Sequence, residues 1–240
     1  MEVLLHEGLS EKYYLRTRAG GRVEDVLVSL LRPGMTFFDA GAHWGYFALL
    51  GSAVVGQEGR SVAFEPDINN VERIRRNIAL NPQLSVGLET VAIADHEGEA
   101  TFQTGHTSDT GSIAPARAGH GGPAPVVAVV TTSLDSYLSE NGIETVDVMK
   151  MDIEGAEVQA IEGMREGLAA GRYGHIVMEW HGAHHERLGD RPTKALALLA
   201  SSGYELSVMR RPKGRLSLEP VTPESVPAER IHLLCRSSRQ

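Results

Sequence analysis

The chain has little cysteine, few aromatic residues and no long apolar run. Its 240 residues include one cysteine, Cys235, and only 5% are aromatic. A single cysteine excludes a disulfide framework and a metal site built from cysteines. No apolar run approaches the length that spans a membrane, and the acidic start does not resemble a signal peptide. These absences predict a reduced, soluble protein that lies in the cytoplasm and does not bind a membrane.

Basic residues are also scarce relative to acidic ones. The chain has 23 Lys and Arg residues against 31 Asp and Glu residues, for a net charge of −8. Nucleic acids bind to positively charged surfaces, so this balance excludes them as a general partner. Since 42% of the residues are hydrophobic, the chain can bury one substantial core. We therefore expect a single domain over residues 1–240; the oligomeric state stays open, a homo-oligomer included.

The most informative stretch covers residues 36–47. Its β-branched and aromatic start, Thr36–Phe38, suits a short buried strand. Gly41 and Gly45 then bracket a turn, and apolar residues from Tyr46 onward open a helix. A strand, a glycine turn and a helix start together let a cofactor approach exposed backbone N–H groups closely.

The residue types of this turn favour S-adenosylmethionine (SAM) as the cofactor. The turn lacks the full G-x-G-x-x-G pattern of a pyrophosphate cradle, and Asp39 before it would repel a phosphate. A cationic, phosphate-free nucleoside fits better, because Gly41, Ala42 and Gly45 would admit its amino-acid portion. Asp39 would interact with its ammonium group, and Glu65, at the end of the next strand, would accept its ribose hydroxyls. An ordinary loop between a strand and a helix is the alternative.

Four further residues are expected at the cofactor. Pro66 directly follows the ribose-binding acid. Ala92 to Asp95 would lie beside the adenine, with Asp95 accepting a hydrogen bond from its amino group; a plain surface turn accounts for these residues equally well. Glu24 lies on a helix predicted over residues 22–31, where it could reach the pocket or be a surface acid.

The rest of the chain alternates between predicted helices, strands and loops. Helices are expected over 67–80, 132–138, 155–168 and 192–202, and strands over 86–94, 99–103, 126–131, 204–209 and 231–236. Residues 1–21 are an expected irregular lead-in, and the Gly- and Pro-rich residues 104–125 an expected lid or acceptor loop, or else a disordered segment. The last two strands have no helix between them, which indicates a hairpin with one antiparallel strand and favours a SAM-dependent fold.

A second informative stretch is a buried strand that ends in acids. Val146–Met151 is typical of a buried strand, and Asp152 and Glu154 follow its carboxyl end. Ligands gather at the carboxyl ends of parallel strands, so both acids should face the same crevice as Asp39 and Glu65. Such acids can hold a divalent ion, orient a substrate hydroxyl or take a proton. A helix N-terminus that favours acids is the alternative.

A third apolar strand ends in Glu179 and His181. Histidine moves protons near neutral pH, so His181 is a candidate general base. Asp152, Glu179 and His181 could together hold Mg²⁺, because carboxylate-rich ligands without cysteine suit a hard ion. We expect the next histidines, His184 and His185, to lie in a solvated loop.

Five motifs of the chain resemble those of the FkbM-type SAM-dependent methyltransferases. They are Asp39–Tyr46, Ala63–Asp67, Arg76–Asn81, Leu134–Asp135 and Lys150–Glu157. The resemblance implies a Rossmann-like α/β fold of class I, with a seven-stranded, mostly parallel sheet and one antiparallel strand. It also implies methyl transfer, most often to a hydroxyl of a sugar or secondary metabolite, and thus a small-molecule acceptor in natural product biosynthesis.

Seven residues match the family's site positions one by one. They are Asp39, Gly41 and Gly45 in the SAM loop, Glu65 as the ribose-binding acid, and Asp152, Glu154 and Gly155 in the D-x-E-G-A-E segment. The chain departs from the family at His43 and Trp44, where the family usually has Asn and an aliphatic residue. Trp44 would then cover the methionine part of the cofactor or part of the acceptor pocket.

The expected reaction transfers the methyl group from the sulfonium of SAM to an acceptor oxygen. Alignment and a dry site contribute most, because the sulfonium is already a good leaving group. His181 would remove the hydroxyl proton, with Asp152 orienting His181 or the acceptor and Glu154 as a third catalytic candidate. In a variant of this mechanism, bound Mg²⁺ would lower the pKa of the acceptor.

Three alternatives stay open. An N-methyltransferase acting on an amine-bearing small molecule needs much the same residues. A nucleotide-sugar or NAD-dependent oxidoreductase would need a fuller glycine pattern than Gly41 to Gly45 supplies. A non-catalytic SAM-binding module would bind the cofactor without turnover, and the acids at two further strand ends speak against it.

Overall fold

The computed structural model describes most of the chain. The described residues are 22–103, 126–182, 185, 192–211 and 215–238. The expected lead-in over 1–21, the expected lid or acceptor loop over 104–125, and His184 therefore lie outside the described residues.

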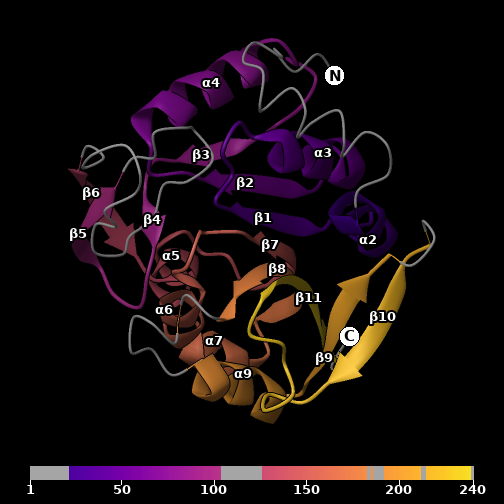
Figure 1. Ribbon diagram of the computed structural model, residues 1–240. Helices are drawn as coiled ribbons and strands as arrows, with labels where there is room; N and C mark the ends of the chain where they lie inside the picture. The colour runs from indigo at the N-terminus through magenta and orange to yellow at the C-terminus, as the bar shows by residue number, and fades with distance from the viewer. Residues whose placement is uncertain (1–21, 104–125, 183–184, 186–191, 212–214, 239–240) are drawn as a thin grey trace.

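An eight-stranded sheet forms the centre of the fold, in the order β10-β9-β11-β8-β7-β1-β2-β3 (Figure 1). Its strands are β1 (Thr36–Ala40), β2 (Arg60–Phe64), β3 (Gly87–Glu89), β7 (Val146–Met151), β8 (Tyr173–His181), β9 (Tyr204–Arg210), β10 (Ser217–Val221) and β11 (Arg230–Ser237). Five neighbouring strands, β8, β7, β1, β2 and β3, pair in parallel. β11 lies between β8 and β9 and is antiparallel to both.

This arrangement confirms the predicted Rossmann-like α/β fold with its mostly parallel sheet. The sheet differs from the expectation by an eighth strand, β10, which pairs antiparallel with the edge strand β9. β10 lies in the stretch that was expected only to separate the last two strands. It is short and contains Pro220, which is tolerated there because an edge strand has a side without ladder hydrogen bonds.

A smaller sheet of three strands lies beside the main one. It consists of β4 (Ala92–Ile93), β5 (Gly98–Gln103) and β6 (Val126–Thr132) in the order β4-β6-β5. The single strand expected over 86–94 is thus divided: β3 belongs to the main sheet, whereas Ala92 and Ile93 pair with Thr131 and Thr132 of β6. The chain changes sheets between these pairings, which the apolar pattern alone does not reveal.

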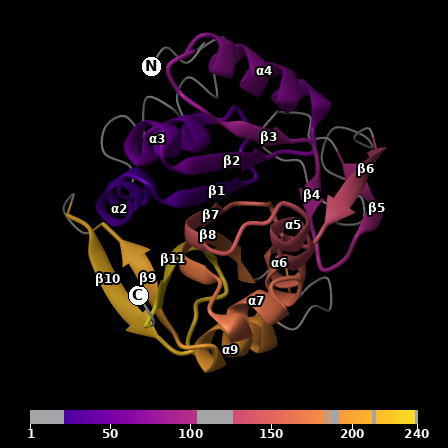
Figure 2. The same ribbon diagram turned by 180° about the vertical axis from the view of Figure 1, so that it is seen from behind.

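Helices cover both faces of the main sheet. They are α2 (Arg22–Leu30), α3 (Tyr46–Val55), α4 (Ile68–Ala79), α5 (Leu134–Glu140), α6 (Glu157–Glu162), α7 (Arg165–Ala170) and α9 (Pro192–Ser201). Figure 2 shows α2, α3 and α4 along one side of the sheet and α5, α6, α7 and α9 along the other. Among the described residues, no helix combines the length and the apolar character that crossing a membrane requires.

Adjacent aromatic residues of β1 pack into these two opposite layers. Phe37 lies in a core cluster with Leu27 of α2 and Phe47 of α3. Phe38 lies in a second cluster with Ile161 of α6. Strands that are buried on both faces read as continuous apolar runs, which is why this strand was recognisable from the sequence.

The helix expected over 155–168 is two short helices, α6 and α7, rather than one. Between them lies Gly163, where a Cβ atom would be 2.3 Å from the carbonyl oxygen of Ala94. Asp135 accepts hydrogen bonds at 2.8 and 3.0 Å from backbone N–H groups in the first turn of α7. The close approach and this side-chain cap together end one helix and start the next.

Gly41 lets the loop after β1 approach the end of β7. Its φ is 76°, and a Cβ atom there would lie 1.8 Å from the carbonyl oxygen of Asp152. Gly34 has a similar φ of 85°, but a Cβ atom there would meet nothing within 4 Å. A side chain at Gly34 would therefore only strain the backbone, whereas a side chain at Gly41 would strain the backbone and also clash with Asp152.

We predict that Gly41→Ala lowers the free energy of unfolding more than Gly34→Ala does. The Gly34 change should cost about 1–2 kcal/mol for the left-handed backbone alone. The Gly41 change should cost about 1–3 kcal/mol more, because the backbone of Asp152 must move. Urea unfolding curves of both variants measure the difference; equal losses would contradict the close contact.

Candidate active site

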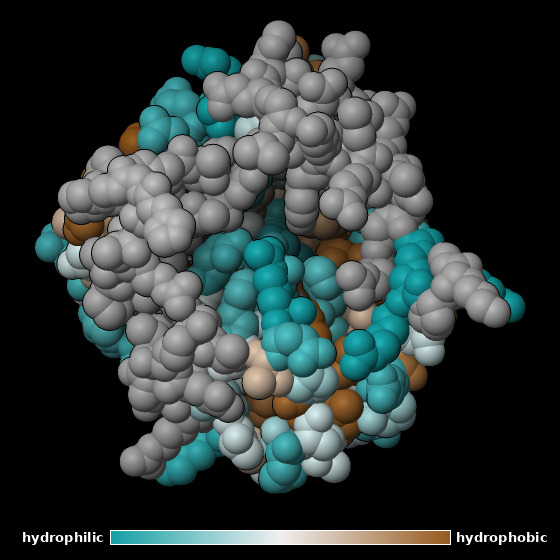
Figure 3. All heavy atoms as spheres, in the orientation of Figure 1, coloured by the Kyte–Doolittle hydropathy of each residue, from teal (hydrophilic) through white to brown (hydrophobic). Residues whose placement is uncertain are grey.

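The carboxyl ends of four neighbouring strands meet at one edge of the main sheet. β2, β1, β7 and β8 are successive parallel neighbours. The backbone joins these ends directly, since Gly41 donates to the carbonyl of Phe64 at 3.0 Å and Asp152 donates to that of Ala40 at 3.0 Å. Figure 3 shows hydrophilic side chains gathered near the centre of the face in this view. The acids predicted to face one crevice thus follow strands that end side by side.

Glu65 holds the glycine turn in place. Its Oε2 accepts a hydrogen bond from the backbone N–H of His43 at 2.7 Å, and its Oε1 accepts one from Asp67 at 3.0 Å. The turn itself needs left-handed backbone at Gly41, His43 and Gly45, with φ values of 76°, 53° and 77°. Burial raises the pKa of the Glu65 carboxyl, although the two backbone hydrogen bonds oppose this shift.

Asp39 lies inside the core beside protein partners, and its expected contact with an ammonium group stays a prediction. Its surface is 0% exposed. Its Oδ2 accepts a hydrogen bond from the backbone N–H of Ala48 at 2.9 Å, and its Oδ1 lies 3.2 Å from Nζ of Lys150. Burial raises the pKa of Asp39, and Lys150 partly offsets that shift. Asp39 therefore connects β1, the start of α3 and β7 from inside the core.

Lys150 was not predicted as a site residue, yet it links the two main motifs. It is buried in β7, and its Nζ donates to the carbonyl oxygen of Gly41 at 2.7 Å. The same atom lies 3.9 Å from Oδ2 of Asp152. A lysine inside an otherwise apolar buried strand needs a charged partner, and that was the signal available in the sequence.

Trp44 is buried as well, and its expected position over the cofactor or the acceptor stays a prediction. It is 3% exposed, with the ring of His43 stacked on it at 5.0 Å and the guanidinium of Arg73 at 4.9 Å from its centroid. Asn77 donates a hydrogen bond to its backbone carbonyl at 2.8 Å. The indole is therefore packed among residues of its own loop and α4.

The remaining residues expected at the cofactor lie in different settings. Ala92 is buried in β4 of the small sheet. Asp95 lies on an exposed turn with its Oδ1 2.6 Å from Nδ1 of His96, which matches the surface-turn alternative. Glu24 is buried on α2, and Pro66 follows β2. Contacts of these residues with a cofactor stay predictions.

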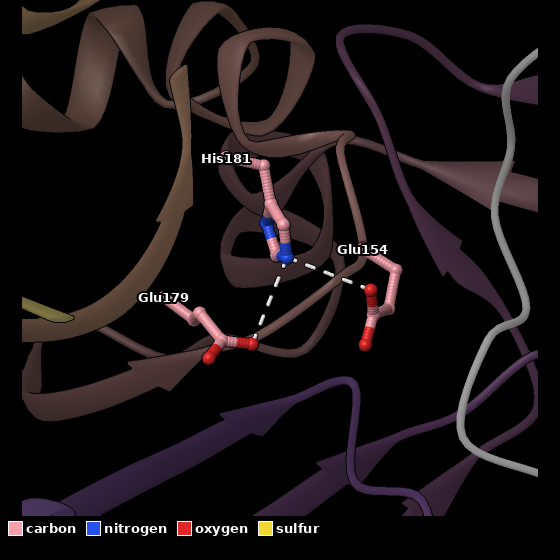
Figure 4. A group of neighbouring side chains, drawn as sticks. All are labelled: Glu154, Glu179 and His181. Carbon is pink, nitrogen blue, oxygen red and sulfur yellow. Dashed lines mark ion pairs between the residues drawn. The ribbon is translucent and has the colours of Figure 1, made fainter. Parts of the chain in front are cut away.

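A compact group of Glu154, Glu179 and His181 lies at the ends of β7 and β8 (Figure 4). Nε2 of His181 is 3.5 Å from Oε2 of Glu154 and 3.7 Å from Oε2 of Glu179. One candidate ligand atom from each residue lies within 4.8 Å of the others. Asp152 does not belong to this group, so the expected metal set of Asp152, Glu179 and His181 is corrected.

Arg230 already supplies a positive charge to this group. Its guanidinium forms an ion pair with Glu179 and lies 3.9 Å from Oε1 of Glu154. It is placed there by β11, where Arg230 is directly opposite His181 of β8. Mg²⁺ requires near-octahedral coordination by oxygen ligands, whereas both carboxylates here face a guanidinium. The donor set therefore fits ion pairs with Arg230 better than a divalent ion.

Behind His181 lies Glu157, the first residue of α6. Its carboxylate is 0% exposed and its Oε1 lies 3.1 Å from Nδ1 of His181. Its Oε2 lies 2.8 Å from Nε2 of His185. His185 is itself buried, with its ring 4.8 Å from that of Trp180, so the expectation that it lies in a solvated loop is wrong.

Neighbouring groups shift the pKa values of Glu157, Glu154 and His181: the first is lowered and the other two are raised. Burial would raise the pKa of Glu157, but hydrogen bonds from two histidines outweigh it and lower the value to about 2. Burial and the charge of Asp152 raise the pKa of Glu154 to about 7. Burial alone would lower the pKa of His181, but the surrounding carboxylates, Glu157 above all, raise it. His181 thus has a raised pKa and lies against a carboxylate whose pKa is lowered.

Comparison with known proteins assigns this chain to a family. A model described as the methyltransferase FkbM domain matches residues 39–206, which is more than half of the chain. The chain belongs to this family. This FkbM methyltransferase is a SAM-dependent enzyme, which removes the oxidoreductase alternative.

Individual relatives agree with the assignment. This chain is 29% identical over 168 residues to the 2-O-methyltransferase NoeI of Sinorhizobium fredii. The match covers 63% of this chain and 67% of NoeI. A methyltransferase FkbM from Methylobacillus flagellatus has a TM-score of 0.51 at 15% identity, covering 88% of this chain and 50% of that one. SMU.1697c of Streptococcus mutans, solved in complex with SAH, has a TM-score of 0.50 at 8% identity, covering 89% and 94%. At such identities the two structures support the fold alone.

We predict that Lys150→Met destabilises the enzyme by about 3–5 kcal/mol, because it leaves the buried Asp39 without its cation. Removing both charges in Asp39→Asn/Lys150→Met should cost less than the single change at Lys150. Lys194→Met, at an exposed position on α9, is the matched control and should be nearly neutral. Urea unfolding measures all three; a double variant less stable than Lys150→Met would contradict the pairing.

Proposed function

We propose that this FkbM methyltransferase methylates a hydroxyl group on a sugar or secondary-metabolite acceptor. The observation that carries the proposal is the arrangement of His181, whose Nδ1 meets a buried carboxylate while its Nε2 faces Glu154 and Glu179. A hydroxyl must lose its proton when it is methylated, and this imidazole is a base at the strand ends where ligands gather. The relative named a 2-O-methyltransferase supports the same acceptor chemistry.

The residues at the ends of β1, β2 and β7 fit a bound SAM molecule, which would supply an electrophilic methyl group. The turn from Gly41 through Ala42 to Gly45 would admit the amino-acid portion, because its glycines have no side chains to block a close approach to the backbone. Glu65 would accept the ribose hydroxyls through the lone pairs that its backbone partners leave available. Oδ1 of Asp152 is buried without a hydrogen-bond partner among the described residues, so Asp152 replaces Asp39 as the proposed partner of an ammonium group.

His181 would act on the acceptor. Its Nε2 would take the proton of the acceptor hydroxyl, and the resulting imidazolium would be stabilised by Glu154, Glu157 and Glu179. Such proton removal by a positioned side chain contributes typically about 10²–10⁴-fold to a rate. Glu154, with its pKa raised to about 7, is the second group able to exchange a proton near neutral pH.

N-methylation of an amine-bearing acceptor is the second candidate. The site carries the carboxylates of Asp152, Glu154 and Glu179 against the guanidinium of Arg230 and the ammonium group of Lys150. This excess of negative charge would attract a protonated amine as readily as it tolerates a hydroxyl. An amine-bearing sugar would therefore be compatible with the same residues.

The test of the proposal uses SAM carrying an isotopically labelled methyl group. The whole enzyme is incubated with a panel of oligosaccharides, glycosides and amino sugars, and labelled products are identified by mass spectrometry and NMR. A labelled methyl ether is the expected product, and a labelled N-methyl group would select the second candidate. SAM binding by calorimetry with no labelled product from any acceptor would instead support a non-catalytic module.

We predict that His181→Ala lowers the transfer rate to a hydroxyl by about 10²–10⁴-fold while SAM binds unchanged. His175→Ala is the control, because His175 lies near the opposite end of the same strand. Surrounding carboxylates raise the pKa of His181 above its usual 6.5, so the wild-type rate should rise with pH through a pKa above that value. Stopped assays across the pH range check both statements; a rate indifferent to His181→Ala would exclude the base.

We also predict that turnover does not depend on a divalent ion. The reason is that Arg230 pairs with Glu179 and lies beside Glu154, where Mg²⁺ would otherwise bind. The measurement compares initial rates before and after dialysis against EDTA, with Mg²⁺ added back. A loss of activity that only Mg²⁺ restores would show that the ion displaces the guanidinium.

A further inference from the structure

We propose that Glu157 is the positioning residue of the site: it holds the ring of His181 so that Nε2 is the atom presented to the acceptor. This inference rests on the proposed function, because it assigns the group that prepares the base. Sequence patterns pointed instead to Asp152 for this task. Asp152, however, has no hydrogen bond or ion pair with His181 among the described contacts.

Hydrogen-bond chemistry determines which nitrogen of His181 can act as a base. An ionised carboxylate only accepts hydrogen bonds, so the Nδ1 that lies 3.1 Å from Oε1 of Glu157 must carry a hydrogen. In the neutral ring the other nitrogen, Nε2, then has the lone pair. That nitrogen is the one directed toward Glu154 and Glu179.

The surroundings of Glu157 keep its carboxylate charged and immobile. Oε1 also accepts a hydrogen bond from the backbone N–H of Gly155 at 3.1 Å, and Oε2 lies 2.8 Å from His185. Glu157 thus has hydrogen bonds to Gly155 and His181 and an ion-pair contact with His185, although none of its surface is exposed. An acid that merely favoured the start of a helix would be expected to point to solvent, whereas this one is turned inward to two imidazoles.

Several charged groups face His181, and Glu157 differs from the others in position. Glu154 follows β7 and Glu179 lies on the same strand as His181, and both are on the Nε2 side. From β11, Arg230 and His232 face Glu179 rather than the ring. Among the described residues that form an ion pair with His181, Glu157 alone is on the Nδ1 side. Its removal should therefore change the tautomer, which removal of the other acids should not.

The first experiment needs no substrate. Nitrogen-15 NMR of histidine-labelled whole enzyme reports the tautomer and pKa of His181, assigned by comparison with His181→Ala. In the wild type we expect the Nδ1–H tautomer and a raised pKa. In Glu157→Gln we expect a mixture of tautomers and a pKa lower by about 1–2 units. Glu162→Gln, at a partly exposed position on the same helix, is the matched control and should leave both unchanged.

The second experiment measures turnover. Glu157→Gln should lower kcat by about 10–100-fold with little change in the Kd of SAM, and the rise of rate with pH should move to lower pH. Glu157→Asp, which keeps the charge on a shorter side chain, should restore part of the pKa shift and part of kcat. It also serves as the folded variant if Glu157→Gln is unstable in thermal unfolding.

The two experiments separate the inference from the proposed function. An unchanged tautomer and pKa of His181 in both Glu157 variants would overturn the inference, whatever the rates are. A changed tautomer in an enzyme whose wild type transfers no methyl group to any hydroxyl would uphold the positioning by Glu157 and refute the proposed function.

Discussion

The structure depends on an ion pair that water does not reach. Asp39 and Lys150 lie on neighbouring strands, and each carries a charge that would be costly to bury alone. Hydrogen bonds to the backbone of Ala48 and Gly41 satisfy the rest of both groups. Because the pair joins the glycine turn to the end of β7, the two halves of the site cannot move independently.

A second set of charges is arranged around His181, and unlike the pair of Asp39 and Lys150 it is partly exposed to solvent. Here the carboxylates form a series from the buried Glu157, through the imidazole, to the buried Glu179 and the partly exposed Glu154. Arg230, whose side chain is 57% exposed, ends the series and limits the accumulation of negative charge. The pair of Asp39 and Lys150 is thus enclosed in the core, whereas the group around His181 includes Glu154, whose pKa is raised to about 7.

Apolar runs and strand-end acids were sufficient to predict the fold class and the neighbourhood of the site. Runs such as Val146–Met151 mark strands buried on both faces, and the acids after them follow from the geometry of parallel sheets. Side-chain partners could not be predicted in the same way. Glu157 looks like an ordinary acid at a helix start, and only packing turns it toward His181. Asp39 was assigned to a ligand because the sequence does not reveal that Lys150 lies beside it.

The antiparallel direction of β11 determines which part of the sequence supplies the positive charge beside Glu179. Strands that run parallel bring their carboxyl ends to the site, but a reversed strand brings its amino end, and so Arg230 of β11 reaches residues of β8. The counter-charge of Glu179 therefore comes from a segment synthesised about 50 residues later. Because β11 follows both β8 and β9 in the sequence, the two strands between which it pairs are complete before Arg230 is added. The positive charge beside Glu179 and Glu154 is thus the last part of this charged group to be synthesised.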